Sequence, residues 1–209
     1  MKVDKNKEID KIDIYFAHIP EALKICTVFP KERNDEINAA SNERVKREKY
    51  AAWLLLEFAL RESLGLTLGE AAISKASNGK WNSKKCEFSI SHSSSCVVVA
   101  ISHDPLGIDI EPLGKERSDT FAKKVLTEEE FLLFSSAPDE KKDELFLTRW
   151  CAKEAIFKMQ GGEAFAPSRI ETLTENVITK RLLVSKKEYV YAVACAEDAI
   201  VTEPREVFL

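Results

Sequence analysis

The sequence has no apolar run long enough to cross a membrane as a helix, which would need about 20 consecutive apolar residues. Its most apolar stretch, residues 51–60, is interrupted by Glu57. Residues 1–13 are highly charged and lack the apolar segment of a secretory signal peptide. We therefore expect no membrane partner and a cytoplasmic location.

Signatures of zinc and nucleotide binding that rest on cysteine, histidine or glycine are also missing. The chain has three histidines and five cysteines, and no two cysteines form a CxxC pair. It contains no glycine-rich P-loop and no HxxEH-type helix. These absences argue against a zinc site and against a P-loop nucleotide hydrolase. The odd number of cysteines predicts reduced thiols in a reducing compartment.

Apolar residues, in contrast, are plentiful: 44% of the chain is hydrophobic and 32% is charged, which excludes a disordered protein. The net charge of −4 predicts no nucleic-acid partner, and any anionic ligand must be bound by a local basic group of residues. One such group, Arg44 to Lys49, includes Lys46 and Arg47. The same residues also fit a solvated helix face.

Two long helices are predicted from apolar residues spaced three and four apart. The first covers residues 43–64 and ends at Gly65, and the second covers residues 140–160 and ends at Gly161. Between them, Thr127 and Glu130 have the spacing of a capping box, which predicts another helix start.

Short β-branched and apolar runs predict the strands, which are residues 12–17, 86–91, 95–102, 106–111 and 189–196. The run 95–102 is apolar on both faces, so we expect it to be buried, and the short polar linkers around it predict a β-meander over 86–111. A helix-then-strand order occurs twice. The chain therefore predicts an α+β fold of two similar halves related by pseudo-two-fold symmetry, residues 1–104 and 105–209. Each half is a helix packed on a small antiparallel sheet, and the two form one compact unit.

The strand at 106–111 carries two acidic residues, Asp109 and Glu111, on one face, because side chains two apart in a strand point the same way. Ile108 and Ile110 then point to the core. Two carboxylates on one face repel each other, and a hard cation such as Mg²⁺ would relieve that repulsion. On its own, the pattern also fits a solvent-facing strand end.

The second helix carries Trp150, Glu154 and Lys158 on one stripe, because their spacing is four residues. Glutamate and lysine at this spacing also fit an ordinary surface pair. The large Trp150 on the same stripe indicates that it faces something other than bulk water.

A polar turn, residues 89–95, contains five serines and His92 near a strand end. Serine N–H and O–H donors suit an anion. A plain hairpin loop would have the same composition.

Taken together, these patterns resemble one family. The order ISHS at 90–93, GIDIE at 107–111 and W-x-x-KEA-x-x-K at 150–158 is similar to that of the 4′-phosphopantetheinyl transferase superfamily, in its long, two-halved, surfactin-synthetase-activating form. Such enzymes transfer the phosphopantetheine arm of coenzyme A to a serine of an apo carrier protein and release adenosine 3′,5′-bisphosphate. Two halves in one chain favour a monomer.

The resemblance also implies roles for residues of the second half. Asp109, Glu111 and Glu154 are implied to hold Mg²⁺, with Glu154 also serving as general base for the serine hydroxyl. Lys158 is implied to pair with the phosphate that is attacked, and Lys153 to contact the pyrophosphate.

In the first half, the resemblance implies contacts with coenzyme A itself. Ser91 and His92 are implied to contact its phosphates, and Lys80 matches a GKP-type turn beside the nucleotide. Arg47 is the expected ligand of the 3′-phosphate, with Arg44 as the alternative.

Three departures from the family pattern remain. Cys151 follows Trp150 where the family more often has Ser, Ala or Thr, Trp81 replaces the proline of the GKP turn, and the arginine of the long helix has no unique match. The acceptor also stays open among acyl, peptidyl and polyketide carriers. Two other functions stay open as well: a non-catalytic relative that binds coenzyme A or a carrier protein, and an unrelated metal-dependent phosphohydrolase.

Overall fold

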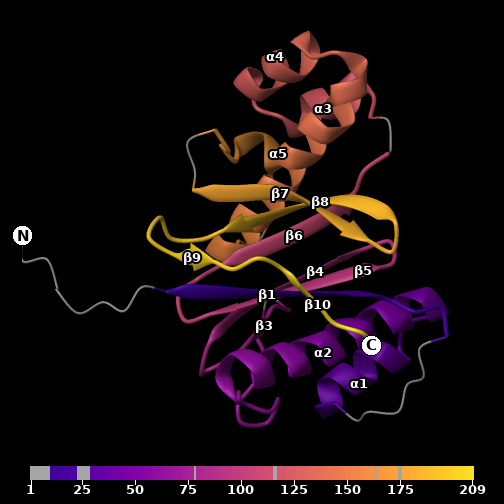
Figure 1. The fold of residues 1–209 in the computed structure, drawn as a ribbon, viewed down its shortest axis with the longest axis vertical. Helices are drawn as coiled ribbons and strands as arrows, with labels where there is room; N and C mark the ends of the chain where they lie inside the picture. The colour runs from indigo at the N-terminus through magenta and orange to yellow at the C-terminus, as the bar shows by residue number, and fades with distance from the viewer. Residues whose placement is uncertain (1–9, 23–28, 78, 115–116, 163, 174–175) are drawn as a thin grey trace, which may run out of the picture.

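The computed structural model describes residues 10–22, 29–77, 79–114, 117–162, 164–173 and 176–209. Its helices and strands form four layers, in which two β-sheets pack face to face and a long helix covers the outer face of each sheet (Figure 1). This arrangement confirms the mixed α and β composition predicted from the sequence.

The first sheet has the strand order β10-β1-β5-β4, and β9 also pairs with β1. The three central strands pair antiparallel, whereas β9 and β10 run parallel to β1. Their bounds are β1 Lys11–His18, β4 Glu87–Ser93, β5 Cys96–Ser102, β9 Ile200–Val201 and β10 Arg205–Glu206. β5 is buried along its whole length, as predicted for residues 95–102.

Helix α2 (Glu43–Leu64) covers the outer face of this sheet, with the short α1 (Lys31–Asn38) beside it. The Asn42 side chain accepts a hydrogen bond from the Arg44 backbone N–H (2.8 Å) and so caps the start of α2. Gly65 ends the helix in the left-handed conformation, with φ at 66°. A separate two-stranded ribbon, β2 (Ser74–Lys75) and β3 (Trp81–Asn82), follows α2.

The second sheet is antiparallel in the order β6-β8-β7, formed by β6 (Gly107–Pro112), β7 (Val177–Val184) and β8 (Lys187–Ala194). Helix α5 (Asp139–Gln160) packs on its outer face. The shorter α3 (Asp119–Val125), α4 (Glu128–Ser136) and the 3₁₀ turn η1 (Pro167–Arg169) pack on α5. α4 begins with the predicted capping box of Thr127 and Glu130.

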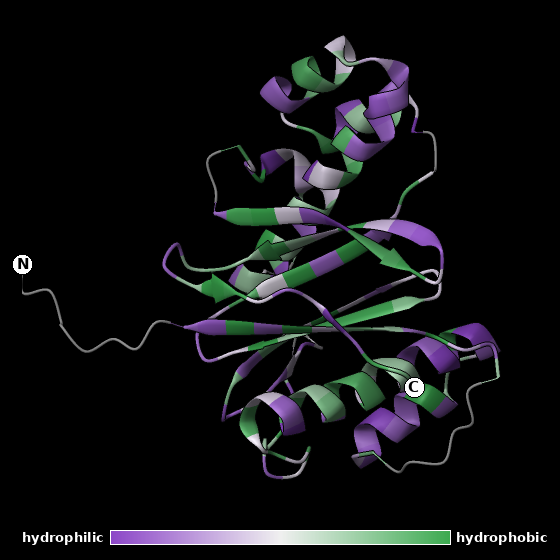
Figure 2. Cartoon of the chain, in the orientation of Figure 1, coloured by the Kyte–Doolittle hydropathy of each residue, from purple (hydrophilic) through white to green (hydrophobic). Residues whose placement is uncertain are grey.

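Apolar side chains from both sheets meet between them. Ile14 and Val98 of the first sheet belong to the same fully buried cluster as Ile108, Ile110 and Tyr191 of the second. Figure 2 shows the central strands as largely hydrophobic and the outer turns of the helices as hydrophilic. Burying each such aliphatic side chain stabilises the fold by roughly 1.5–3 kcal/mol, so the sheets are held together by their shared core.

The predicted β-meander over residues 86–111 is wrong in its last strand. β4 and β5 form an antiparallel hairpin, but β6 pairs with β8 in the other sheet. The chain leaves the first sheet after Ser102 and starts the second at Gly107. The short linker therefore connects two layers.

Each sheet carries one long helix, as expected for the two halves. β9 and β10, near the end of the chain, join the first sheet beside β1. The pseudo-two-fold relation and the boundary between residues 104 and 105 stay predictions.

Four of the five cysteines lie in the described part of the chain, namely Cys86, Cys96, Cys151 and Cys195, and all four are buried free thiols. Cys26 lies outside it. No helix among the described residues is long and apolar enough to span a bilayer.

Candidate active site

The candidate site lies where the edge strand β4 of the first sheet meets the edge strand β6 of the second. Three side chains of β4 hydrogen bond to β6, which fixes the two edges against each other. α5 packs directly on β6. The site therefore combines residues from both sheets and from the outer helix.

Gly107 lets α5 come close to β6. A Cβ atom at this position would lie 1.9 Å from the Ala155 carbonyl oxygen, a distance that no side chain could occupy. Because Glu154 precedes Ala155 and Lys158 follows one turn later, this close approach brings both side chains to the acidic strand. The glycine of the GIDIE motif is thus required by packing.

A cavity of about 360 Å³ lies at this junction. Its lining includes the predicted stripe of α5 and the acidic pair of β6, and consists of Ile90, Ser91, His92, Asp109, Glu111, Trp150, Glu154 and Lys158. The predicted arrangement of Trp150, Glu154 and Lys158 on one face is therefore confirmed. All three carboxylates face the same space as one lysine.

Asp109 is the most enclosed of these acids. Its Oδ1 atom accepts hydrogen bonds from Lys158 Nζ and Ser91 Oγ, both at 2.7 Å. Lys158 Nζ also donates to the Ile108 carbonyl (3.1 Å). Oδ2 is buried without a hydrogen-bond partner among the described residues. Cys151 lies beside this carboxylate, and its thiol donates to the Val190 carbonyl (3.6 Å).

The pKa of Glu154 is raised above its ordinary value. Burial is the main cause, the Asp109 charge adds to it, Lys158 opposes it, and Glu111 raises it further. A glutamate with a raised pKa is a better proton acceptor than an exposed one. Such a carboxylate in a cavity is suited to general-base chemistry.

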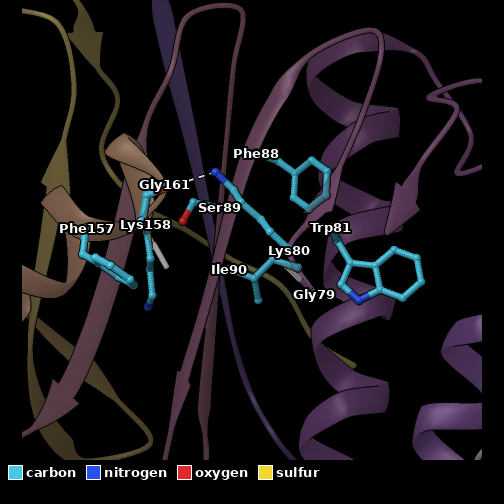
Figure 3. Close-up of a pocket in the computed structure, with 10 residues that line it drawn as sticks. Gly79, Lys80, Trp81, Phe88, Ser89, Ile90, Phe157, Lys158 and Gly161 are labelled. Atoms are coloured by element: carbon cyan, nitrogen blue, oxygen red, sulfur yellow. Dashed lines mark hydrogen bonds between the residues drawn. The ribbon is translucent and has the colours of Figure 1, made fainter. Parts of the chain in front are cut away.

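A second cavity, of about 370 Å³, lies on the other side of Lys158 (Figure 3). Trp81 and Phe88 lie on the side near α2, and Phe157 on the side of α5. Lys80 reaches across between them, and its Nζ atom donates to the Lys158 carbonyl (3.1 Å). This cavity is therefore aromatic with a basic edge, and it shares Ile90 and Lys158 with the acidic cavity.

The two predicted arginines lie apart from the acidic cavity. Arg44 and Arg47 line a third cavity, of about 290 Å³, together with Glu48. Glu48 lies 3.5 Å from Arg44 Nε and 3.9 Å from His92 Nδ1. Burial lowers the pKa of His92, while the Glu48 charge opposes this effect and Lys158 adds to it. His92 and Glu48 thus separate the third cavity from the acidic one.

Lys153 is not among the residues that line these cavities. Its side chain is fully enclosed and forms a 2.7 Å ion pair with Glu130, and Nζ also donates to the Ile170 carbonyl (2.5 Å). The ammonium therefore connects α5 to α4 and to the segment after η1. It has no part in the site described here.

The acidic cavity fits a hard cation in its chemistry. No group of three His, Cys, Asp or Glu side chains in the described part of the chain is close enough to hold a metal ion by itself. Mg²⁺, however, is usually bound by one or two carboxylates together with substrate phosphates. Asp109, Glu111 and Glu154 line one cavity, and Asp109 keeps a buried oxygen without a partner. This oxygen-rich set of like charges matches that mode of binding.

Several residues of the site were not predicted from the sequence. Ser89 and Ser93 hydrogen bond to β6, Glu48 contacts His92, and Phe157 lines the aromatic cavity. The serines alternate in the segment SISHS, a period-two signal that was present in the sequence. Glu48 and Phe157 carried no comparable signal, because their roles depend on contacts between distant segments.

The second half of the chain matches a known protein family. Residues 105–202 match the family model described as the 4′-phosphopantetheinyl transferase superfamily. This segment includes Asp109, Glu111, Glu154 and Lys158, whereas Lys80, Ser91 and His92 lie before it.

Three curated relatives illustrate the similarity. 4′-Phosphopantetheinyl transferase gsp of Aneurinibacillus migulanus is 34% identical over 105 residues, covering 48% of this chain and 43% of that protein. Transferase psf-1 of Bacillus pumilus is 29% identical over 111 residues, covering 52% of this chain and 47% of that protein. Holo-[acyl-carrier-protein] synthase of Streptococcus agalactiae is 44% identical over 61 residues, covering 26% of this chain and 51% of that protein.

The chain spans about half the length of the curated relatives it matches. Each of these relatives is named for modifying a carrier protein or for transferring phosphopantetheine. Their agreement with the family model confirms the resemblance that the three motifs indicate. Over residues 105–202, the chain is similar to the 4′-phosphopantetheinyl transferase superfamily.

Proposed function

We propose that this protein transfers the 4′-phosphopantetheine group of coenzyme A to a serine of an apo carrier protein, with adenosine 3′,5′-bisphosphate as the other product. The observation that carries the proposal is the acidic cavity, where Asp109, Glu111, Glu154 and Lys158 lie together inside the segment that matches the family. A phosphoryl transfer needs a proton acceptor and a way to neutralise phosphate charge. This cavity has groups suited to both.

Glu154 serves as the proton acceptor. A serine hydroxyl is a weak nucleophile and needs a positioned base to remove its proton. Glu154 is half-buried on α5, and its raised pKa makes it more basic than an exposed glutamate. The serine oxygen attacks the phosphorus of the phosphopantetheine phosphate, the bond to the bridging oxygen of the pyrophosphate breaks, and the serine proton moves to Glu154.

Lys158 stabilises negative charge at the attacked phosphate. Its ammonium pairs with Asp109 and remains partly exposed on the wall shared by the acidic and aromatic cavities. A phosphate group can therefore approach Lys158 from either side. Because the charge lies in a partly enclosed space, its effect on the transition state is larger than it would be in water.

Asp109, Glu111 and Glu154 are the residues that would hold Mg²⁺. The ion would supply positive charge against the pyrophosphate of coenzyme A. The protein residues then position the donor and the serine, and positioning carries most of the catalysis in phosphoryl transfer.

Coenzyme A spans the aromatic and acidic cavities in this proposal. Trp81 and Phe88 offer ring faces for the adenine base, and Lys80 lies at the edge of the same cavity. The pyrophosphate then lies at Lys158, where the two cavities meet. Arg47 and Arg44, the basic residues that line the third cavity, are the candidates for the 3′-phosphate, and His92 of the acidic cavity is a further candidate for a phosphate of coenzyme A.

The proposal is tested by incubating the protein with coenzyme A, Mg²⁺ and an apo acyl carrier protein, and measuring adenosine 3′,5′-bisphosphate by chromatography. We expect release that requires the carrier protein and that disappears when the carrier serine is replaced by alanine. Equal release without a carrier would indicate hydrolysis of coenzyme A and would contradict a transferase. Tight coenzyme A binding with no release on acyl, peptidyl or polyketide carriers would instead favour a non-catalytic binding protein.

A further inference from the structure

Three serines on β4 follow one another at every second position. Ser89, Ser91 and Ser93 therefore share one face of the strand, and that face meets β6. Each serine makes a hydrogen bond to β6 at successive points along that strand. We call these three residues the serine ladder.

The bonds of the serine ladder differ in kind. Ser89 Oγ accepts from the backbone N–H of Ile108 (3.0 Å). Ser91 Oγ donates to Asp109 Oδ1 (2.7 Å), and Ser93 Oγ donates to Glu111 Oε2 (2.7 Å). One serine thus fixes the backbone of β6, and the other two fix its two carboxylates.

Ser89 and Ser91 are buried, and so is Asp109. A hydroxyl enclosed next to a carboxylate donates its proton to it, because the carboxylate can only accept. The Ser91 proton is therefore used by Asp109. A phosphate oxygen at the same place would compete with that carboxylate for a single proton.

We propose that Ser91 and Ser93 are positioning residues, whose hydroxyls hold Asp109 and Glu111 in the orientation that binds the divalent cation, rather than direct ligands of coenzyme A. This inference rests on the proposed function, because the cation belongs to that reaction. Residues that hydrogen bond to metal-binding carboxylates set their orientation, and losing such a partner weakens metal affinity by about 10- to 100-fold.

The test uses Mn²⁺ as a probe, titrated by calorimetry into protein with saturating coenzyme A. We expect Ser93→Ala and Ser91→Ala to weaken Mn²⁺ binding by about tenfold or more. Ser93→Thr should retain most of the affinity, because threonine keeps the hydroxyl. Ser102→Ala, on β5, is the control from outside the three cavities: this buried serine donates to the Asp104 carbonyl, so we expect its replacement to lower the melting temperature and leave Mn²⁺ affinity within about twofold of wild type.

Thermal unfolding of each variant separates positioning from stability. If Ser91→Ala and Ser93→Ala lower the melting temperature but bind Mn²⁺ as tightly as wild type does, the serine ladder only joins the sheets and the inference is overturned. No Mn²⁺ binding to the wild-type complex would overturn it too. Weakened Mn²⁺ binding in both variants, with no carrier protein modified by wild type, would support the inference and contradict the proposed function.

Discussion

Helix α5 carries two lysines that form similar ion pairs in very different surroundings. Lys153 pairs with Glu130 and Lys158 pairs with Asp109, each at 2.7 Å. Both side chains of the first pair are fully enclosed, whereas the Lys158 side chain of the second is 26% exposed. Distance and charge are the same, so they cannot distinguish the roles of the two pairs.

The enclosed pair, Lys153 with Glu130, has a structural role and holds parts of the fold together. Glu130 also caps α4 and accepts a hydrogen bond from Thr172 Oγ1 (2.5 Å), while Lys153 donates to the Ile170 carbonyl. Every partner in this network is protein, and the network joins α4, α5 and the segment after η1. A buried pair with all its hydrogen bonds satisfied cannot exchange a partner for a ligand without a large cost.

The open pair, Lys158 with Asp109, borders two cavities, so its partly exposed lysine can contact a phosphate while it keeps its pair with the buried Asp109. Glu154 shares the same space, and its pKa is raised, whereas that of Glu130 is lowered. Burial alone would raise the pKa of Glu130, but Lys153 and Thr172 outweigh that effect. The comparison therefore separates a stabilised carboxylate from one held ready to take a proton.

The largest expected effect is on Glu154. Replacement by glutamine keeps the shape but removes the base, so we expect Glu154→Gln to lower the rate of carrier modification by about 10²- to 10⁴-fold. Coenzyme A affinity should stay within a few-fold of wild type, as measured by calorimetry. Wild-type turnover by this variant would show that the reaction in the acidic cavity needs no carboxylate at position 154.

Lys158→Met should come next. Removing one group that stabilises charge in a transition state costs about 10²- to 10³-fold in rate. Because Lys158 is partly exposed but its partner Asp109 is buried, we expect a lower melting temperature as well, with a smaller decrease than Lys153→Met causes. A variant that unfolds instead of losing activity would place Lys158 in the scaffold with Lys153.

Lys153→Met should show the opposite result. Removing one partner of a buried pair leaves an unpaired charge and costs about 3–5 kcal/mol of folding free energy. We expect a lower midpoint in urea denaturation, and a rate close to wild type at temperatures where the variant is folded. Lys153→Met combined with Glu130→Gln should recover part of the loss, because glutamine is neutral and can still cap α4. A large loss of rate in folded Lys153→Met would remove the contrast between the two pairs.

The smallest expected effect is on the pH dependence of stability. The pKa of Glu154 is raised by folding, so this residue favours the folded state below its unfolded pKa, and that contribution is lost as pH rises through the folded pKa. The pKa of Glu130 is lowered, so its contribution is present above its unfolded pKa and is lost as pH falls through the folded value. Glu154→Gln should therefore raise the unfolding free energy at neutral pH, and Glu130→Gln should lower it. Denaturation curves at pH 4 and pH 7 would check both signs.

The comparison also explains what the sequence could predict. The helix over residues 43–64 was predicted at its observed bounds because its signals, the apolar spacing and the stop at Gly65, are local. The strand at 106–111 was recognised for the same reason. The partner of this strand was not predicted, because β6 pairs with β8, which lies far along the chain.

The site could likewise be predicted only where local sequence signals report it. Asp109, Glu111, Glu154 and Lys158 were predicted from motif order, and the fold brings all four to one cavity. Lys153 belongs to the same motif, yet its ammonium is enclosed by Glu130 and Ile170. Which way a lysine points depends on the packing of α4 and η1 on α5, and no local pattern in the sequence reports it.

The most direct test of this account is the intact mass of apo carrier proteins after incubation with the wild-type protein, coenzyme A and Mg²⁺. We predict that at least one acyl, peptidyl or polyketide carrier gains the mass of a single phosphopantetheine group on its serine. The same carrier incubated with Glu154→Gln should keep its apo mass over the same time. An unchanged mass for every carrier with wild-type protein, or an equal gain with Glu154→Gln, would contradict the account.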